Sequence, residues 1–177
     1  MQMRGKVAKK FGDDINTDYI IPAHLLQESW DKKFFADHAF EGYDPTFGPA
    51  CRANKESVVV ARNNFGCGSS REQAVYSIKY NNVVAVVAQS FPDIFFRNCL
   101  NNGLLPIQIS DTSKIDVGDD LVVDLESRKV EDVTKGLEYP IMATDAAIDS
   151  MKRGGSLGFV RERLRQKLKA QPMRASP

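Results

Sequence analysis

The alternation of apolar and polar residues is clearest in the middle of the chain. Val83–Ala88 is an unbroken apolar run, mostly of valine, which is typical of a strand buried on both faces of a parallel sheet. Arg71–Tyr80 places Ala74, Val75 and Ile78 on one face at helical spacing. Similar patterns predict strands over Ser57–Ala61 and Leu105–Ile109, and a helix over Pro92–Asn101 with Ile94, Phe95 and Cys99 on one side. This alternating order predicts parallel strands joined by crossover helices.

The regions on either side of this centre have weaker patterns. Gly5–Phe11 predicts an opening strand, and Asp31–Phe40 predicts a helix from only a few apolar positions. Glu41–Asn54 contains two glycines and two prolines, so we expect a surface loop there. After Ser110 the sequence predicts a hairpin and then a short helix, over Leu121–Leu125, Lys129–Val133 and Asp145–Met151. The expected fold class is α/β: a mixed sheet with crossover helices and a β-rich second half.

Composition excludes several classes of protein. With 177 residues, 42% hydrophobic and 27% charged, the chain has neither a disordered nor a collagen-like composition. A net charge of +1 argues against a nucleic-acid-binding domain, and the longest apolar run is far too short to span a membrane. The N-terminus lacks the apolar core of a signal peptide, so we expect a cytoplasmic protein.

The net charge hides an uneven distribution along the chain. Residues 151–177 carry eight basic and one acidic side chains, while the preceding 150 residues carry sixteen basic and twenty-two acidic ones. We therefore expect one domain over residues 1–160 and a basic helical tail over 161–177. The tail is interpreted as a solvated amphipathic helix, with docking to an acidic face of a partner as the alternative.

Cysteine and histidine are scarce, which limits the metal chemistry of the chain. Cys51, Cys67 and Cys99 form no Cys-x-x-Cys pair, and His24 and His38 are the only histidines. We therefore expect free thiols in a reducing compartment, and no metal or cofactor bound by this chain.

The segment Asn64–Glu72 is the most informative for function because it follows a strand and opens a helix. Its two glycines let a ligand approach the main chain, and Ser69 and Glu72 have the spacing of a capping box. The first-turn N–H groups of the helix and the Arg71 guanidinium predict a pocket for a small carboxylate or phosphate. The segment lacks the patterns of a nucleophile elbow and of a Walker loop. A capped helix without chemistry is the alternative.

Three segments together resemble a known family. They are Gly12–Pro22, Asn64–Glu72 and Ser90–Pro106, in that order. The chain is similar over about residues 4 to 160 to the swivelling β/β/α domain of the aconitase superfamily. Within that superfamily it resembles the free-standing small subunits of 3-isopropylmalate dehydratases. Three motifs in the same order are far more specific than any one of them.

The resemblance implies a hydro-lyase that is active only with a large subunit. That partner carries a 4Fe–4S cluster, and the complex interconverts 2-isopropylmalate and 3-isopropylmalate in leucine biosynthesis. The motif match places the catalytic base on Ser69 and the binding of substrate carboxylate on Ser70 and Arg71. Asp18 and Thr17 are expected to order the site, and a higher heteromer is possible.

The substrate expectation rests on the segment after Pro22, which in this superfamily covers the variable group of the substrate. It contains no lysine or arginine up to Ser29, and Glu28 would repel a third carboxylate. His24, Leu25 and Leu26 are therefore expected to contact a branched alkyl group, unless both leucines belong to the core. His24, Gln73 and Phe91–Asp93 depart from the usual motifs. They leave 2-methylmalate, dimethylmalate or homoaconitate open as substrates, and a non-catalytic anion-binding module open as the function.

Overall fold

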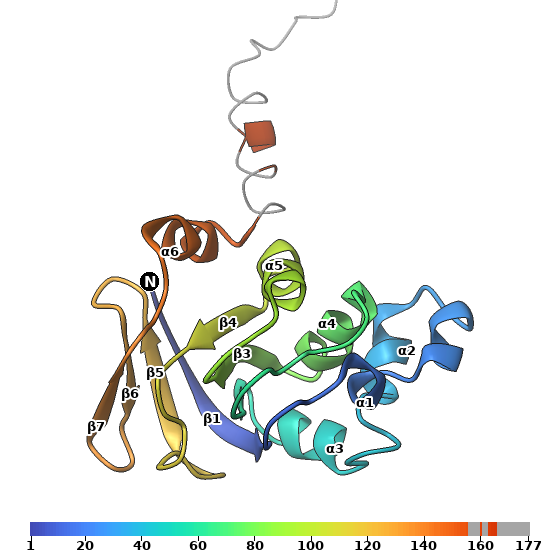
Figure 1. The fold of residues 1–177 in the computed structure, drawn as a ribbon, viewed down its shortest axis with the longest axis horizontal. Coiled ribbons are helices and arrows are strands. Elements are labelled where there is room, and N and C mark those ends of the chain that lie inside the picture. The colour runs from blue at the N-terminus through green and yellow to red at the C-terminus, as the bar shows by residue number, and fades with distance from the viewer. Residues whose placement is uncertain (156–159, 161–162, 166–177) are drawn as a thin grey trace, which may run out of the picture.

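The computed structural model describes residues 1–155, 160 and 163–165. Within these residues one seven-stranded mixed sheet has the strand order β4-β3-β2-β1-β5-β6-β7. Its strands are β1 (Gln2–Lys10), β2 (Ser57–Val60), β3 (Val83–Ala88), β4 (Leu105–Gln108), β5 (Asp120–Asp124), β6 (Lys129–Asp132) and β7 (Leu137–Pro140). The helices are α1 (Thr17–Ile20), the 3-10 helix η1 (Ala23–Gln27), α2 (Lys32–Asp37), α3 (Phe47–Arg52), α4 (Glu72–Lys79), α5 (Asp93–Asn102) and α6 (Asp145–Lys152). Figure 1 shows α1 to α4 grouped on one side of the molecule and β5 to β7 on the other.

The parallel half of the sheet confirms the expectation for the centre of the chain. β1 pairs with β2, β2 with β3 and β3 with β4, all in parallel. Parallel neighbours require crossover connections, and α4 and α5 supply two of them. Helix α5 ends at Gly103, whose φ of 70° is the left-handed conformation that glycine adopts most easily.

The antiparallel half extends the sheet from the other side of β1. β5 pairs antiparallel with β1, and β6 with β5, so the predicted hairpin is confirmed. β7 was not expected from the sequence. It is an edge strand of only four residues, with Leu137 and Tyr139 half-buried, and it ends at Pro140. Proline is tolerated at such an edge because no further strand needs its N–H group.

The expectation of a surface loop over Glu41–Asn54 was wrong, because this segment contains α3. Phe47 and Cys51, one helical turn apart, are fully buried. The Phe47 ring packs against Phe40, with 4.5 Å between ring centroids. Pro49 lies in the first turn of α3, where its missing N–H group costs no hydrogen bond. The aromatic packing therefore outweighs the loop-like composition.

The sheet separates two hydrophobic cores, one on each face. Val59 belongs to the core beneath α1 to α5, while its neighbours Val58 and Val60 belong to the core that includes Ile148 and Met151 of α6. Neighbouring residues divide in this way because side chains of a strand alternate between its two faces. Strand β2 is thus buried on both faces.

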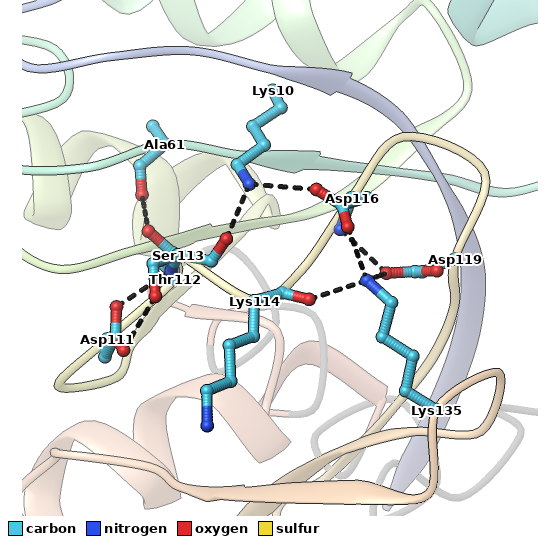
Figure 2. A network of polar contacts seen from close by, with 9 residues as sticks. All are labelled: Lys10, Ala61, Asp111, Thr112, Ser113, Lys114, Asp116, Asp119 and Lys135. Atoms are coloured by element: carbon cyan, nitrogen blue, oxygen red, sulfur yellow. Dashed lines mark hydrogen bonds and ion pairs between the residues drawn. The ribbon is translucent and has the colours of Figure 1, made fainter.

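A polar network fastens the loop before β5 to the rest of the sheet, as Figure 2 shows. Lys135, in the turn between β6 and β7, donates to the Lys114 carbonyl (2.6 Å) and pairs with Asp116 (2.6 Å) and Asp119 (2.7 Å). Lys10 of β1 reaches the same Asp116 carboxylate at 3.2 Å. This cluster joins three segments that are far apart in the sequence.

Among the described residues, none of the helices is both long and apolar enough to cross a membrane. The expected basic tail over 161–177 falls largely outside the described residues, so its boundary stays a prediction.

Candidate active site

The loops that follow β1 and β2 join at the carboxyl ends of the parallel strands. The main-chain N–H of Gly66 donates to the Ile15 carbonyl (2.8 Å), and that of Thr17 donates to the Cys67 carbonyl (2.7 Å). Asn16 and Cys67 form an isolated parallel bridge. The carboxyl edge of an open α/β sheet is the usual place for ligands. We call this main-chain pairing of Ile15–Thr17 with Gly66–Cys67 the seam. It fixes the main chain directly before the predicted catalytic residues.

Both glycines of the second loop are required by its shape. Gly66 and Gly68 have φ values of +84° and +95°. A Cβ on Gly66 would lie 2.2 Å from the Phe95 ring, and one on Gly68 would lie 2.4 Å from Asn16 Oδ1. The loop therefore packs closely against α5 on one side and against the loop after β1 on the other.

A cleft opens to solvent between this loop and the start of α5. The loop side is lined by Gly66, Gly68, Ser69, Ser70 and Arg71. The α5 side is lined by Pro92, Ile94, Phe95 and Asn98. Ile94 lies on the same side of α5 as the buried Phe95 and Cys99, but it is 49% exposed because it faces this opening from the first turn of the helix. The cleft thus combines a polar wall with an apolar one.

The capping box predicted from Ser69 and Glu72 is not formed. Helix α4 begins at Glu72, and its N-cap is Arg71 in an extended conformation, without a side-chain hydrogen bond to the helix end. The Glu72 carboxylate accepts instead from the Tyr76 hydroxyl at 3.1 Å. The first-turn N–H groups consequently have no side-chain cap, and the Ser69 side chain is exposed at the cleft.

The structure brings Asp18, Thr17 and Arg71 together. The Arg71 guanidinium forms an ion pair with Asp18 and donates to the Ile21 carbonyl at 3.3 Å. Its side chain is only 12% exposed, so its direction is well defined. The buried Thr17 donates its hydroxyl to the Ser69 carbonyl at 3.0 Å. Helix α1 therefore holds both Arg71 and the main chain of Ser69.

Asn98 is a cleft residue that the sequence analysis missed. Its Nδ2 lies 3.4 Å from Ser70 Oγ, to which it donates. The available signal was helical spacing, because Asn98 follows Ile94 by four residues and Phe95 by three, on the same side of α5. The spacing on that side was used only to predict the helix.

The structure does not bring His24, Leu25 and Leu26 into the cleft. They lie on η1, which turns Leu25 into the hydrophobic core with 5% exposure. Leu26 packs against the same core, and His24 is exposed. The two leucines therefore occupy the core positions that were the alternative to substrate contact.

The cysteines are poor candidates for cluster ligands. Cys51 and Cys99 are buried, and burial raises the pKa of Cys51 to about 12 and that of Cys99 well above its ordinary value. Burial and the nearby Asp14 carboxylate also raise the pKa of the Cys67 thiol. Iron is bound by thiolates, so this donor set does not fit a cluster. In the part of the chain that is described, no three His, Cys, Asp or Glu side chains are grouped to hold a metal ion.

Comparison with known proteins agrees with this geometry. The 3-isopropylmalate dehydratase small subunit 1 of Archaeoglobus fulgidus is 43% identical over 155 residues, 87% of this chain and 94% of the relative. The chain belongs to the 3-isopropylmalate dehydratase small-subunit family. The aconitase C-terminal domain model matches residues 44–112, which include the segment Asn64–Glu72.

The chain is also similar to two proteins from one archaeon. The crystal structure of a 3-isopropylmalate dehydratase from Methanocaldococcus jannaschii superimposes with a TM-score of 0.83 at 36% identity, covering 97% of this chain and all of that one. The methanogen homoaconitase small subunit of the same organism is 40% identical over 86% of this chain and 93% of the relative. The expected aconitase-type fold is confirmed by the structural match.

Proposed function

We propose that this chain is the small subunit of a heteromeric hydro-lyase that interconverts 2-isopropylmalate and 3-isopropylmalate. The observation that carries the proposal is the cleft, where Ser69, Ser70 and Arg71 meet at the uncapped start of α4. The names of the 3-isopropylmalate dehydratase relatives support the reaction and the need for a large subunit.

Ser69 is proposed as the base that removes the carbon-bound proton. That proton is weakly acidic, since it lies beside a carboxylate, and a serine alkoxide is strong enough to take it. The electron pair of the C–H bond forms the double bond as the C–O bond at the adjacent carbon breaks. The leaving hydroxyl takes one proton to depart as water, and this proton is assigned to an acid of the large subunit. Rehydration in the opposite orientation gives the isomer and returns the proton from Ser69.

Arg71 and Ser70 are proposed to bind and orient a carboxylate of the substrate. A guanidinium and a hydroxyl both donate hydrogen bonds to carboxylate oxygens. The first-turn N–H groups of α4 add partial positive charge at the same place, which also favours the Ser69 alkoxide. Asp18 and Thr17 keep Arg71 and the Ser69 main chain in position.

Departure of the hydroxyl is assigned to the large subunit, where a 4Fe–4S cluster supplies Lewis-acid chemistry. The cysteines of this chain do not fit such a cluster, for the reasons of burial given above. The site is therefore proposed to be completed only when the partner covers the cleft.

The apolar wall of the cleft supports a substrate with an alkyl group. Pro92, Ile94 and Phe95 face Arg71 and the serines across the opening. Burial of an isopropyl group against such a wall is favourable by roughly 1.5–3 kcal/mol. A third carboxylate would find no cation on the α5 side, because the lining residues there are uncharged.

The test is turnover by the assembled complex of both subunits. Ser69→Ala is expected to lower kcat about 10²–10⁴-fold, the usual effect of a positioned base. Ser110→Ala is the matched control, because Ser110 is exposed and lies outside the cleft, and it should leave turnover unchanged. Near-normal turnover by a correctly assembled Ser69→Ala complex would refute the base assignment.

A substrate panel tests the remaining alternatives. We expect turnover of isopropylmalate and little turnover of citrate or homoaconitate. Rapid conversion of homoaconitate would move the function to that of the homoaconitase relative. The panel also contains 2-methylmalate and dimethylmalate, which differ by few methyl groups and are separated by only about 1–3 kcal/mol per methylene. Absence of turnover with every substrate would favour an anion-binding module.

A further inference from the structure

Asn98 holds a position in the cleft to which neither the motifs nor the family relationship assigns a role. It lies on the second turn of α5, and it is partly buried across the opening from Ser69 and Arg71. Its partner in the structure is Ser70, one of the proposed carboxylate-binding residues. The contact thus joins α5 to the loop that precedes α4.

The placement of α5 against the loop is rigid, which gives this contact a defined geometry. Phe95, one turn before Asn98, is 2% exposed and packs so closely on Gly66 that no Cβ fits between them. Its ring also contacts Phe65 edge-on, with 5.8 Å between centroids. The helix therefore presents the Asn98 amide to Ser70 from a fixed backbone.

The chemistry of the contact sets the direction of the Ser70 hydroxyl. A serine hydroxyl has one hydrogen to donate and two lone pairs to accept. When the Asn98 N–H occupies a lone pair, the hydrogen remains available for an acceptor in the cleft. A substrate carboxylate is an acceptor only. Among the described residues, no protein group accepts a hydrogen bond from the Ser70 hydroxyl.

We propose that Asn98 is a positioning residue that turns the Ser70 hydroxyl into a hydrogen-bond donor toward the substrate carboxylate. The proposal rests on the proposed function, since it needs the substrate to be a carboxylate bound at Ser70. Asn98 acts through Ser70 and takes no part in proton transfer. Its effect is expected on substrate binding more than on the chemical step.

The experiment measures kcat and KM for 3-isopropylmalate with the assembled complex. Asn98→Ala should raise KM about 3–10-fold, the value of one neutral hydrogen bond, with kcat changed less than about 2-fold. Asn98→Asp should raise KM further, because its carboxylate accepts the Ser70 proton and repels the substrate. The control is Asn102→Ala on the same helix. Its side chain bonds to the Asn98 carbonyl and not to the cleft, so KM should stay at the wild-type value.

A double-mutant cycle separates positioning from a merely structural role. In a Ser70→Ala background, Asn98→Ala should change KM by less than about 2-fold, because the group it orients is gone. Effects of the two substitutions that multiply would overturn the proposal, and so would an Asn98→Ala complex with wild-type KM.

Calorimetric binding of 3-isopropylmalate to the same complexes makes the test independent of turnover. A wild-type complex that binds without converting the compound would refute the proposed function and still report on Asn98. A wild-type complex that neither binds nor converts it would overturn both proposals.

Discussion

Gly66 allows a sharp test of how tightly the loop Asn64–Glu72 is packed. In Gly66→Ala the new methyl group would meet the Phe95 ring at 2.2 Å, where ordinary carbon contacts are about 3.5–4.0 Å. The ring cannot withdraw freely because it is almost fully buried and contacts Phe65. The loop or α5 must therefore shift, which destabilises the folded state.

The stability lost in Gly66→Ala has two contributions, one from the backbone and one from packing. A φ of +84° costs alanine about 1–2 kcal/mol, and overpacking a buried ring costs about 1–3 kcal/mol. We expect the free energy of unfolding to fall by about 2–5 kcal/mol. Equilibrium unfolding in urea, followed by circular dichroism, measures it from the midpoint with the slope unchanged.

Substitutions at two other glycines distinguish the backbone cost from the packing cost. Gly118 has a φ of +98° and nothing within 4 Å of a new Cβ, so Gly118→Ala should show the backbone cost alone. Gly12 has neither constraint, and Gly12→Ala should be neutral or stabilising by about 0.4–1 kcal/mol. If Gly66→Ala and Gly118→Ala lose equal stability, the packing argument is refuted. If all three behave alike, the argument from backbone conformation fails as well.

Three further predictions concern other parts of the structure. Burial, followed by the neighbouring Asp119, raises the pKa of the fully buried Asp132, whose Oδ2 has no hydrogen-bond partner. The folded state therefore favours the protonated form of Asp132, and the protein loses stability as the pH rises from 3.8 through the raised pKa. In urea unfolding, Asp132→Asn should become more stable relative to wild type as the pH rises above 3.8. A difference in unfolding free energy that does not change with pH would contradict this. Phe47→Ala should cost about 3–5 kcal/mol of unfolding free energy, since the ring is fully buried, and a loss below about 1 kcal/mol would mean that α3 is not anchored by it. Trp30, the single tryptophan, is 91% exposed, so iodide should quench the fluorescence of the free subunit almost as it quenches free tryptophan, whereas a protected emission would place Trp30 elsewhere.

The centre of the fold was predictable because its apolar pattern is unambiguous. Val83–Ala88 is too short for a typical helix and too apolar for an exposed strand, and it forms β3. The segment over α3 was not predictable in the same way. Its glycines and prolines indicate a loop, and only the burial of Phe47 against aromatic residues from other segments overrides them.

The site was predictable where its residues are contiguous. Ser69, Ser70 and Arg71 form one motif, and the structure places all three at the cleft. The contact between Arg71 and Asp18 joins residues 53 positions apart, and only the resemblance to a family linked their segments. Asn98 was missed because helical spacing alone does not distinguish a side chain at a cleft from one in the core.

The main-chain seam between Ile15–Thr17 and Gly66–Cys67 has a consequence for altering this protein. Backbone hydrogen bonds are available to almost any residue, so this pairing of the two loops depends on residue identity mainly where glycine is required, at Gly66 and Gly68. Residues beside the opening, such as Ile94, can therefore be exchanged in a library while the frame that carries Ser69 and Arg71 keeps its form. A search for new hydroxy-acid substrates can therefore vary exposed positions at the opening while Gly66, Gly68 and Phe95, which hold the loop in place, are kept.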